Sequence, residues 1–250
     1  MTAPRPLIAG NWKMFGLGPA LDEARQVADA ISDSRPRARV ALCAPATLVE
    51  RMARAVAGSA LIVGGQDLHT ETSGAFTGDV SGQMLHEAGA RMVIIGHSER
   101  RAAYGESDAL VAAKVKAALG AGLEPVICVG ETLAEREAGR TLEVICGQVK
   151  ASVPTEVSGK AFAVAYEPVW AIGTGLTPTL EQIEEAHVAL RAALVESLGE
   201  AGRAPPILYG GSVKPSNAAE ILKAREVGGA LVGGASLKAV DFLAIVRAAD

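Results

Sequence analysis

A single carboxylate, Glu167, follows the apolar run 161–166 and directly precedes Pro168. Burial at the end of such a run raises the pKa of a glutamate and makes it a stronger base. Proline biases the preceding residue toward extended geometry, which gives the side chain a defined direction. We therefore expect Glu167 to act as a general base, although an exposed acid at a strand end would explain the pair taken alone.

Other polar groups stand at equivalent positions after other apolar runs. His97 follows Gly96 and leads into a short helical turn, whose dipole should lower the histidine pKa and favour a neutral ring able to donate to a carbonyl oxygen. Asn11 and Lys13 end the first run on one face of an extended chain, with Trp12 opposite. Alone, each has a structural explanation as a solvated lysine or a satisfied histidine. Because all of them follow apolar runs, a catalytic role is favoured for the group.

Paired glycines end the last two apolar runs. Gly210 and Gly211 precede Ser212, and the pair 233–234 precedes a short segment that can present a helix N-terminus. Glycine lets backbone N–H groups approach an anion closely. Each pair alone could be a tight turn, but together they predict a phosphate site.

An uncharged segment follows the predicted base. The loop 168–178 begins and ends with proline and contains Gly173 and Gly175. Prolines and glycines at such places are typical of a lid that moves on hinges.

These residues need a scaffold that brings the ends of distant runs together. Continuous apolar strands that alternate with amphipathic helices predict a parallel sheet covered by helices. Eight repeats in one domain, residues 1–250, fit a closed (β/α)₈ barrel of the α/β class. An open doubly wound sheet fits less well, because G-x-G-x-x-G is absent after the first strand. The strands are expected to begin near residues 6, 39, 60, 91, 123, 161, 206 and 226, with helices over 19–31, 46–56, 107–119, 179–198, 216–222 and 240–248.

Composition narrows the functional classes. A net charge of −4 argues against a sequence-independent nucleic acid binder, and no uncharged run reaches the roughly 18 residues that span a bilayer. The first residues resemble neither a secretory signal nor a transit peptide. Cys43, Cys128 and Cys146 are widely spaced in apolar surroundings, which favours reduced thiols in a cytoplasmic protein. No motif indicates a metal site.

Five stretches resemble the signatures of triosephosphate isomerase, in order and at the expected strand ends. They are residues 11–13, 96–101, 165–175, 209–213 and 231–236, and GAFTG (74–78), YGESD (104–108) and CVGE (128–131) are also similar. The resemblance runs from residue 7 to 237. One departure is Leu176, where many members of the family carry lysine, and it concerns only the kinetics of the lid.

The resemblance implies a TIM barrel that interconverts dihydroxyacetone phosphate and D-glyceraldehyde 3-phosphate, in glycolysis and gluconeogenesis, without metal or organic cofactor. This family is a standard example of tuned acid and base groups. By resemblance, Glu167 would move a proton between neighbouring carbons through an enediolate. Neutral His97 would polarise the carbonyl and shuttle protons between the enediolate oxygens. Lys13 and Asn11 would stabilise the negative charge, and Glu99 would orient Lys13.

The resemblance also implies a binding role for backbone groups and small side chains. The substrate-binding set, besides Asn11 and Lys13, would be Ile172, Gly173, Ser212, Gly233 and Gly234. Closure of the lid would exclude water and restrain elimination of phosphate from the enediolate.

A long loop, 66–82, exceeds the usual length of a connection and holds Phe76 between two glycines. In the resembled family this loop docks near the active site of the neighbouring subunit, with the equivalent of Thr77 close to Asn11. We therefore expect a homodimer with Phe76 and Thr77 at the contact. The alternative is a monomer with an unattached loop.

Two other functions fit the same residues. A paralogous isomerase acting on a tetrulose phosphate would use the same acid–base set and phosphate site. A non-catalytic barrel that binds phosphosugars would need the cradle alone, but intact Lys13, His97 and Glu167 argue against it.

Overall fold

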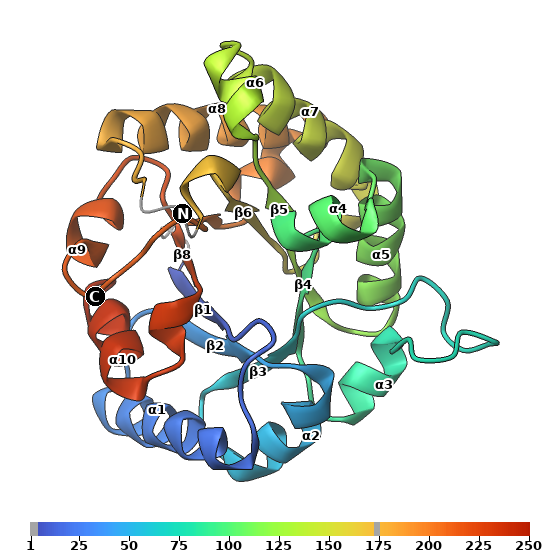
Figure 1. Ribbon diagram of the computed structural model, residues 1–250, viewed down its shortest axis with the longest axis vertical. Coiled ribbons are helices and arrows are strands. Elements are labelled where there is room, and N and C mark those ends of the chain that lie inside the picture. Colours follow the sequence, from blue (N-terminus) through green and yellow to red (C-terminus); the bar gives the residue numbers. More distant parts are fainter. Residues whose placement is uncertain (1–4, 173–175) are drawn as a thin grey trace.

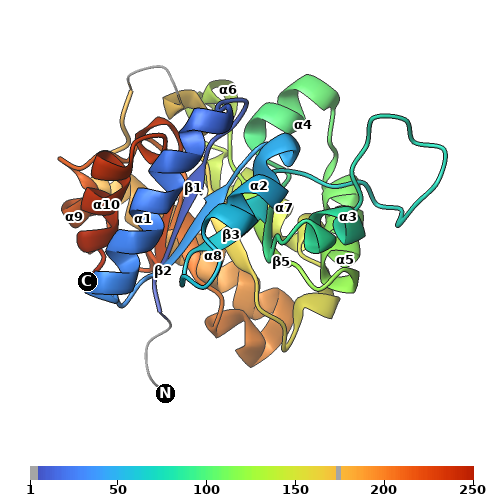
Figure 2. The same ribbon diagram turned by 90° about the horizontal axis from the view of Figure 1, so that it is seen from below.

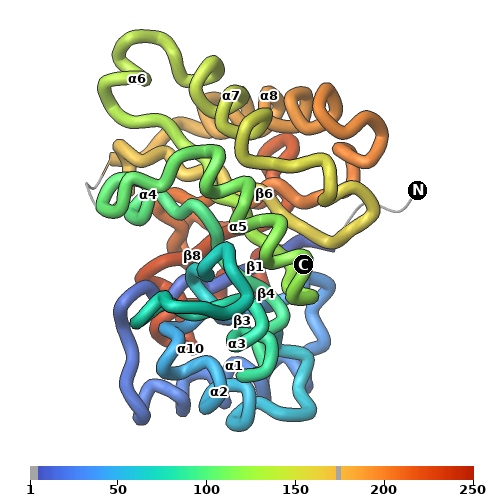
Figure 3. The backbone as a smooth tube through the Cα atoms, turned by 90° about the vertical axis from the view of Figure 1, so that its right-hand side faces the viewer, coloured from blue at the N-terminus to red at the C-terminus, as the bar shows by residue number. Residues whose placement is uncertain are grey.

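The computed structural model describes residues 5–172 and 176–250, so Gly173 and Gly175 lie outside the described residues. Within that part of the chain, eight parallel strands pair in sequence order into a closed barrel. The predicted (β/α)₈ fold is therefore confirmed. Figure 1 shows the helices as a ring around the strands. The barrel closes where β1 pairs with β8, and Figure 3 shows these first and last strands side by side.

The strands begin within three residues of the predicted positions. Each is an almost wholly buried apolar run, as parallel strands covered by helices must be. Their bounds are β1 (Leu7–Asn11), β2 (Arg39–Cys43), β3 (Ile62–Gly65), β4 (Met92–Ile95), β5 (Glu124–Val129), β6 (Ala163–Tyr166), β7 (Ile207–Tyr209) and β8 (Gly229–Val232).

The predicted helices are all present, with bounds shifted by three residues at most. The larger ones are α1 (Leu21–Ser34), α2 (Ala46–Ala55), α5 (Asp108–Gly120), α7 (Thr141–Ser152), α8 (Leu180–Leu198) and α10 (Ala239–Arg247), and the shorter ones are α3 (Gly82–Glu87), α4 (Ser98–Tyr104), α6 (Leu133–Glu137) and α9 (Ala218–Ile221). The short 3₁₀ helices are η1 (Gly18–Ala20), η2 (Thr155–Val157), η3 (Val169–Ala171), η4 (Gly199–Arg203) and η5 (Gly234–Ser236).

Local capping explains why α8 begins where it does. The Thr179 side chain accepts from the N–H of Gln182, and the Gln182 side chain accepts from the N–H of Thr179. This reciprocal pair satisfies two N–H groups that a helix start leaves without partners. The cap fixes the point at which the chain returns to regular structure after the predicted lid.

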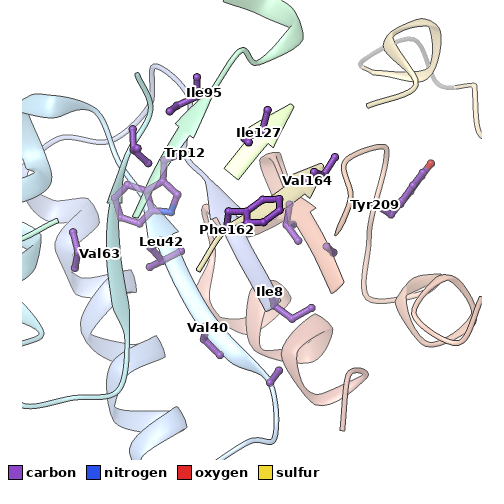
Figure 4. Close-up of a cluster of buried hydrophobic side chains, with 14 of the residues drawn as sticks. Ile8, Trp12, Val40, Leu42, Val63, Ile95, Ile127, Phe162, Val164 and Tyr209 are labelled. Carbon is purple, nitrogen blue, oxygen red and sulfur yellow. The ribbon is translucent and has the colours of Figure 1, made fainter. Parts of the chain in front are cut away.

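Alternation along the strands divides the core into two layers. In β1, Leu7 and Ala9 face the barrel interior, whereas Ile8 faces the helices. Small and branched side chains fill the interior, and large ones such as Trp12 and Phe162 pack between strands and helices, as Figure 4 shows. The barrel is a packed core, so a ligand can bind only at its ends.

The carboxyl ends of parallel strands lie at one end of the barrel, which we call the C-terminal end, and their starts lie at the N-terminal end. The loop 66–82 reaches away from the body of the barrel, as Figure 2 shows. It links β3 to α3, and its return is anchored where the N–H of His69 donates to the carbonyl of Val80 at 2.9 Å.

Candidate active site

A cavity of about 450 Å³ lies at the C-terminal end of the barrel. It collects side chains from strands that are distant in the sequence. The predicted site residues that line it are Asn11, Lys13, His97, Glu167, Ile172, Ser212, Gly233 and Gly234. Glu99 lines an adjoining hollow and reaches the cavity through its contact with Lys13.

Glu167 directly follows β6 and is almost fully buried, with 1% of its surface exposed. Its Oε2 accepts from the backbone N–H of Ser98 at 2.9 Å, and its Oε1 lies 2.8 Å from His97 Nε2. Two glycines make room for it. A Cβ on Gly130 would lie 1.8 Å from the Glu167 carbonyl oxygen, and one on Gly210 would lie 2.9 Å from its Cγ. Larger residues at these positions would displace the carboxylate.

His97 is the N-cap of α4 and is 6% exposed. Its Nδ1 accepts from the backbone N–H of Glu99 at 3.2 Å. The nitrogen that accepts cannot carry a proton, so a neutral ring in this position holds its proton on Nε2. Nε2 faces Glu167 and the cavity, where it can donate.

The sequence expectations for the two pKa values were wrong in direction. Burial raises the pKa of Glu167, but the facing His97, its hydrogen bond and the Ser98 N–H lower it by more, so the net pKa lies below the ordinary value. Burial lowers the pKa of His97, but the Glu167 charge and hydrogen bond raise it by more. Each group was assessed alone in the sequence, whereas in the fold they pair with each other.

Lys13 has a backbone φ of 49°, a left-handed conformation that is costly for a residue other than glycine. Its N–H donates to Asn11 Oδ1 at 2.9 Å, and its carbonyl accepts from Gln66 Nε2 at 2.9 Å. Its Nζ contacts Glu99 Oε1 at 2.5 Å. Two contacts therefore fix the Lys13 backbone beside Asn11, and the third holds its ammonium group in the cavity.

The predicted phosphate cradle lines the same cavity as the carboxylate, through Gly210, Gly211, Ser212, Gly233 and Gly234. A Cβ on Gly233 would lie 3.7 Å from Lys13 Cε, whereas one on Gly234 would meet nothing within 4 Å. Backbone here is therefore open to a ligand. Ser212 Oγ donates to the carbonyl of Ala171 at 3.3 Å, which ties the cradle to the segment after Glu167.

Glu131 contacts the segment after Glu167 through Val169 and Trp170. It was not identified as a functional candidate from the sequence. Its buried carboxylate accepts from Trp170 Nε1 at 2.8 Å and from the Tyr166 hydroxyl at 3.1 Å, and it pairs with Arg136. Its carbonyl accepts from the N–H of Val169. Its position after an apolar strand was the same signal that identified Glu167. Gln66, a lone amide, gave no signal at all.

A second hollow of about 490 Å³ adjoins the cavity and shares Asn11, Lys13 and His97 with it. The loop 66–82 forms one of its walls. Phe76, which is 41% exposed, stacks on His69 with ring centroids 4.0 Å apart, and Thr77 is also exposed. Neither Phe76 nor Thr77 is among the described residues that line the catalytic cavity of its own chain.

The described residues contain no group of three histidine, cysteine or acidic side chains arranged to hold a metal ion. Over the same residues, no helix is long and apolar enough to cross a membrane.

Comparison with known proteins agrees with this geometry. The profile of the family "Triosephosphate isomerase" matches residues 6–249. A triosephosphate isomerase of Caulobacter vibrioides is 61% identical over 99% of this chain and 98% of its own, and that of Ruegeria pomeroyi is 56% identical over 98% of both. The crystal structure of triosephosphate isomerase from Bartonella henselae superposes with a TM-score of 0.92 at 47% identity, covering 98% of each chain. The chain therefore belongs to the triosephosphate isomerase family.

Proposed function

We propose that the chain interconverts dihydroxyacetone phosphate and D-glyceraldehyde 3-phosphate, a step used in both glycolysis and gluconeogenesis. The observation that carries this proposal is the convergence of Glu167, His97 and Lys13 on one cavity beside a glycine cradle. A carboxylate base, a carbonyl-directed donor and a fixed cation are what proton transfer next to a carbonyl requires.

Glu167 is the proposed base. It removes a proton from the carbon that bears the hydroxyl group, the C–H electron pair forms the C=C bond, and the carbonyl becomes an enediolate oxygen. His97 passes the hydroxyl proton to the former carbonyl oxygen, and return of the carbon-bound proton from Glu167 to the neighbouring carbon completes the isomerisation. The carboxylate contacts His97 through Oε1 and the Ser98 N–H through Oε2, and each oxygen keeps a further lone pair that can accept the proton.

His97 and Lys13 are proposed to stabilise the enediolate. The Nε2–H of neutral His97 donates to an oxygen of the substrate, because Nδ1 is occupied by the Glu99 N–H. Lys13 contributes a positive charge that Glu99 orients through the 2.5 Å contact, and Asn11 adds an amide donor. These groups are in position before reaction, so little reorganisation is needed.

The phosphate is proposed to bind the N–H groups of Gly233 and Gly234 and the region of Ser212, with Gly173 and the side chain of Ile172 contributing from the lid. Open space at Gly234 supports the approach of an anion to the backbone. The lid is proposed to span 168–178 and to hinge at η3, where Glu131 holds Trp170.

The variant Glu167→Gln tests the assignment of the base. We expect a loss of kcat of about 10²–10⁴, because a general base contributes that much, while affinity for a phosphorylated hydroxamate that mimics the enediolate stays within a few fold. A coupled spectrophotometric assay and calorimetry measure the two quantities. Activity near that of the original enzyme would refute the assigned base. Glu135→Gln is the matched control, because Glu135 only caps α6.

A homodimer is proposed from the apolar surface around the second hollow. Met14 is 95% exposed, Tyr104 70%, Met84 55% and Phe76 41%, which is unusual for side chains of this type. Burial of this surface against a second chain, with Phe76 and Thr77 beside the partner's Asn11, would remove it from water. The free thiols of Cys43, Cys128 and Cys146 support a cytoplasmic location.

Light scattering coupled to size exclusion tests the dimer. We expect a dimer for the original chain and a monomer for Phe76→Asp, because a buried unpaired carboxylate is costly. Leu142→Asp, an exposed apolar residue on α7, is the control and should remain dimeric. A stable monomer of the unaltered chain would reject the proposal.

A further inference from the structure

Two adjoining hollows lie at the N-terminal end of the barrel, opposite the active site. They measure about 640 and 530 Å³, and Arg5 and Arg39 line both. Figure 2 shows the chain entering β1 at this end, on the side away from α4 and α6. Arg35 lines only the larger hollow and Lys160 only the smaller one, so cations stand on both sides of a shared wall.

The charges around these hollows are strongly unequal. Four cations line them, and Glu124 is the carboxylate among their described lining residues. Glu124 is held by both terminal nitrogens of Arg39, so this pair is neutral. Three positive charges remain in a chain whose net charge is −4, so the accumulation is local.

The remaining cations have few competing partners. Arg5 donates its Nε to the carbonyl of Arg37 at 2.9 Å, which orients the guanidinium and leaves its terminal nitrogens available. The side chains of Arg35 and Lys160 make no hydrogen bond or ion pair with any described residue. Asp33 is two residues from Arg35, and Asp250 accepts from the backbone N–H of Arg37. Neither aspartate lines a hollow.

Arg35 is also held in an unfavourable backbone conformation. It follows the last residue of α1 with a φ of 48°, a position where helices commonly place glycine because other residues are strained there. Arginine at this position carries a cost that no side-chain contact within the described residues offsets. A ligand for its guanidinium would offset it.

We propose that the N-terminal end of the barrel binds a polyphosphate chain through Arg5, Arg35 and Lys160. Guanidinium groups match phosphate oxygens in pairs, which favours phosphate over a carboxylate. Because Arg5 lines both hollows, linked phosphates offer oxygens to cations of both, whereas a single phosphate has fewer oxygens to share among them. Apolar lining, including Val40 and Phe162, provides a surface for an attached organic group.

Calorimetry with inorganic tripolyphosphate tests the proposal, with glycerol 3-phosphate saturating the catalytic cavity throughout. We expect one additional site per chain, with affinity that falls as salt rises. Arg35→Gly and Lys160→Ala should each weaken it at least tenfold, because each removes a charged contact. Lys223→Ala is the control, because it removes an exposed cation outside both hollows and should change affinity less than twofold.

Arg35→Gly also separates loss of the site from loss of the fold. Glycine accepts this backbone conformation, so the variant should melt at the same or a higher temperature and keep its isomerase activity while it loses tripolyphosphate. Equal affinities for ATP and tripolyphosphate would support recognition of the phosphate chain alone. A higher affinity for ATP would support use of the apolar lining. Absence of the additional site, equal weakening by Lys223→Ala, or stronger binding of a single-stranded oligonucleotide would overturn the proposal.

Discussion

The two ends of the barrel differ in whether the charged side chains assigned to ligand binding are paired. At the C-terminal end, the charged groups assigned to the reaction are paired, as Glu167 is with His97 and Lys13 with Glu99. At the N-terminal end, Arg35 and Lys160 face open hollows without a partner among the described residues. Both ends are built from the loops of the same closed sheet, so the difference lies in the residues and not in the architecture.

The two ends also differ in the groups that they offer to a phosphate. The C-terminal end offers backbone N–H groups at Gly233 and Gly234, which suit one phosphate without adding a fixed charge beside the base. The N-terminal end offers side-chain cations, which suit several linked phosphates. Strained backbone occurs at both ends, at Lys13 and at Arg35. Of the two, Lys13 has a contact between its side chain and a described residue, the ion pair with Glu99.

The largest contrast is expected between alanine variants of these two strained residues. Lys13→Ala should lower kcat/KM by about 10²–10³, because it removes a charge that stabilises the enediolate. Arg35→Ala lies at the other end of the barrel and should leave kcat/KM within twofold. A steady-state assay of both variants decides the matter. A large loss for Arg35→Ala would mean that the two ends are coupled.

A smaller effect is expected for Glu131→Gln, which alters the support of the lid without touching substrate. The amide keeps the size of the side chain but weakens the charge-assisted bonds to Trp170 and Arg136. We expect kcat to fall by about tenfold with KM changed less, because lid motion and not phosphate binding is affected. Glu137→Gln, an exposed acid on α6, serves as the control. An unchanged kcat would show that the hinge does not depend on this carboxylate.

The sequence predicted the fold and the positions of the site residues because both follow from local signals. Apolar runs at regular intervals predicted each strand, and Glu167, His97 and Lys13 were recognised because each ends such a run. The pKa directions were not predictable, because they arise from a contact between residues on different strands. The hollows at the N-terminal end could not be predicted either. In the sequence, nothing distinguishes Arg5, Arg35 and Lys160 from ordinary surface cations.

The pairing of His97 with Glu167 should also make stability depend on pH at the C-terminal end. Folding raises the pKa of His97 above 6.5, so its contribution is complete below pH 6.5 and is lost as pH rises through the raised pKa. Folding lowers the pKa of Glu167 below 4.5, so its contribution is present above pH 4.5 and is lost as pH falls through the lowered pKa. The pair therefore stabilises the fold most between these two values.

Urea denaturation of the original chain and of His97→Gln across this range measures the effect. The difference in free energy of unfolding should be largest between pH 4.5 and 6.5 and should decline on both sides. Arginines at the N-terminal end stay charged throughout, so Arg35→Ala should give a difference that does not vary with pH. A flat profile for His97→Gln would contradict the pairing. The control His86→Gln, a residue outside the cavity, should match the original chain.

The smallest effect concerns two strained residues at the same end, Arg35 and Glu226, with φ of 48° and 63°. Glycine relieves the strain at either position but costs entropy in the unfolded chain, which leaves a net gain of about 0.5–1 kcal/mol. Glu226 also accepts from Arg191 Nε at 2.9 Å, a partly buried pair worth about 1 kcal/mol, whereas Arg35 has no such contact to lose. We therefore expect Arg35→Gly to raise the free energy of unfolding and Glu226→Gly to leave it nearly unchanged. An equal gain in the free energy of unfolding for both variants would mean that the pair between Glu226 and Arg191 contributes nothing to stability.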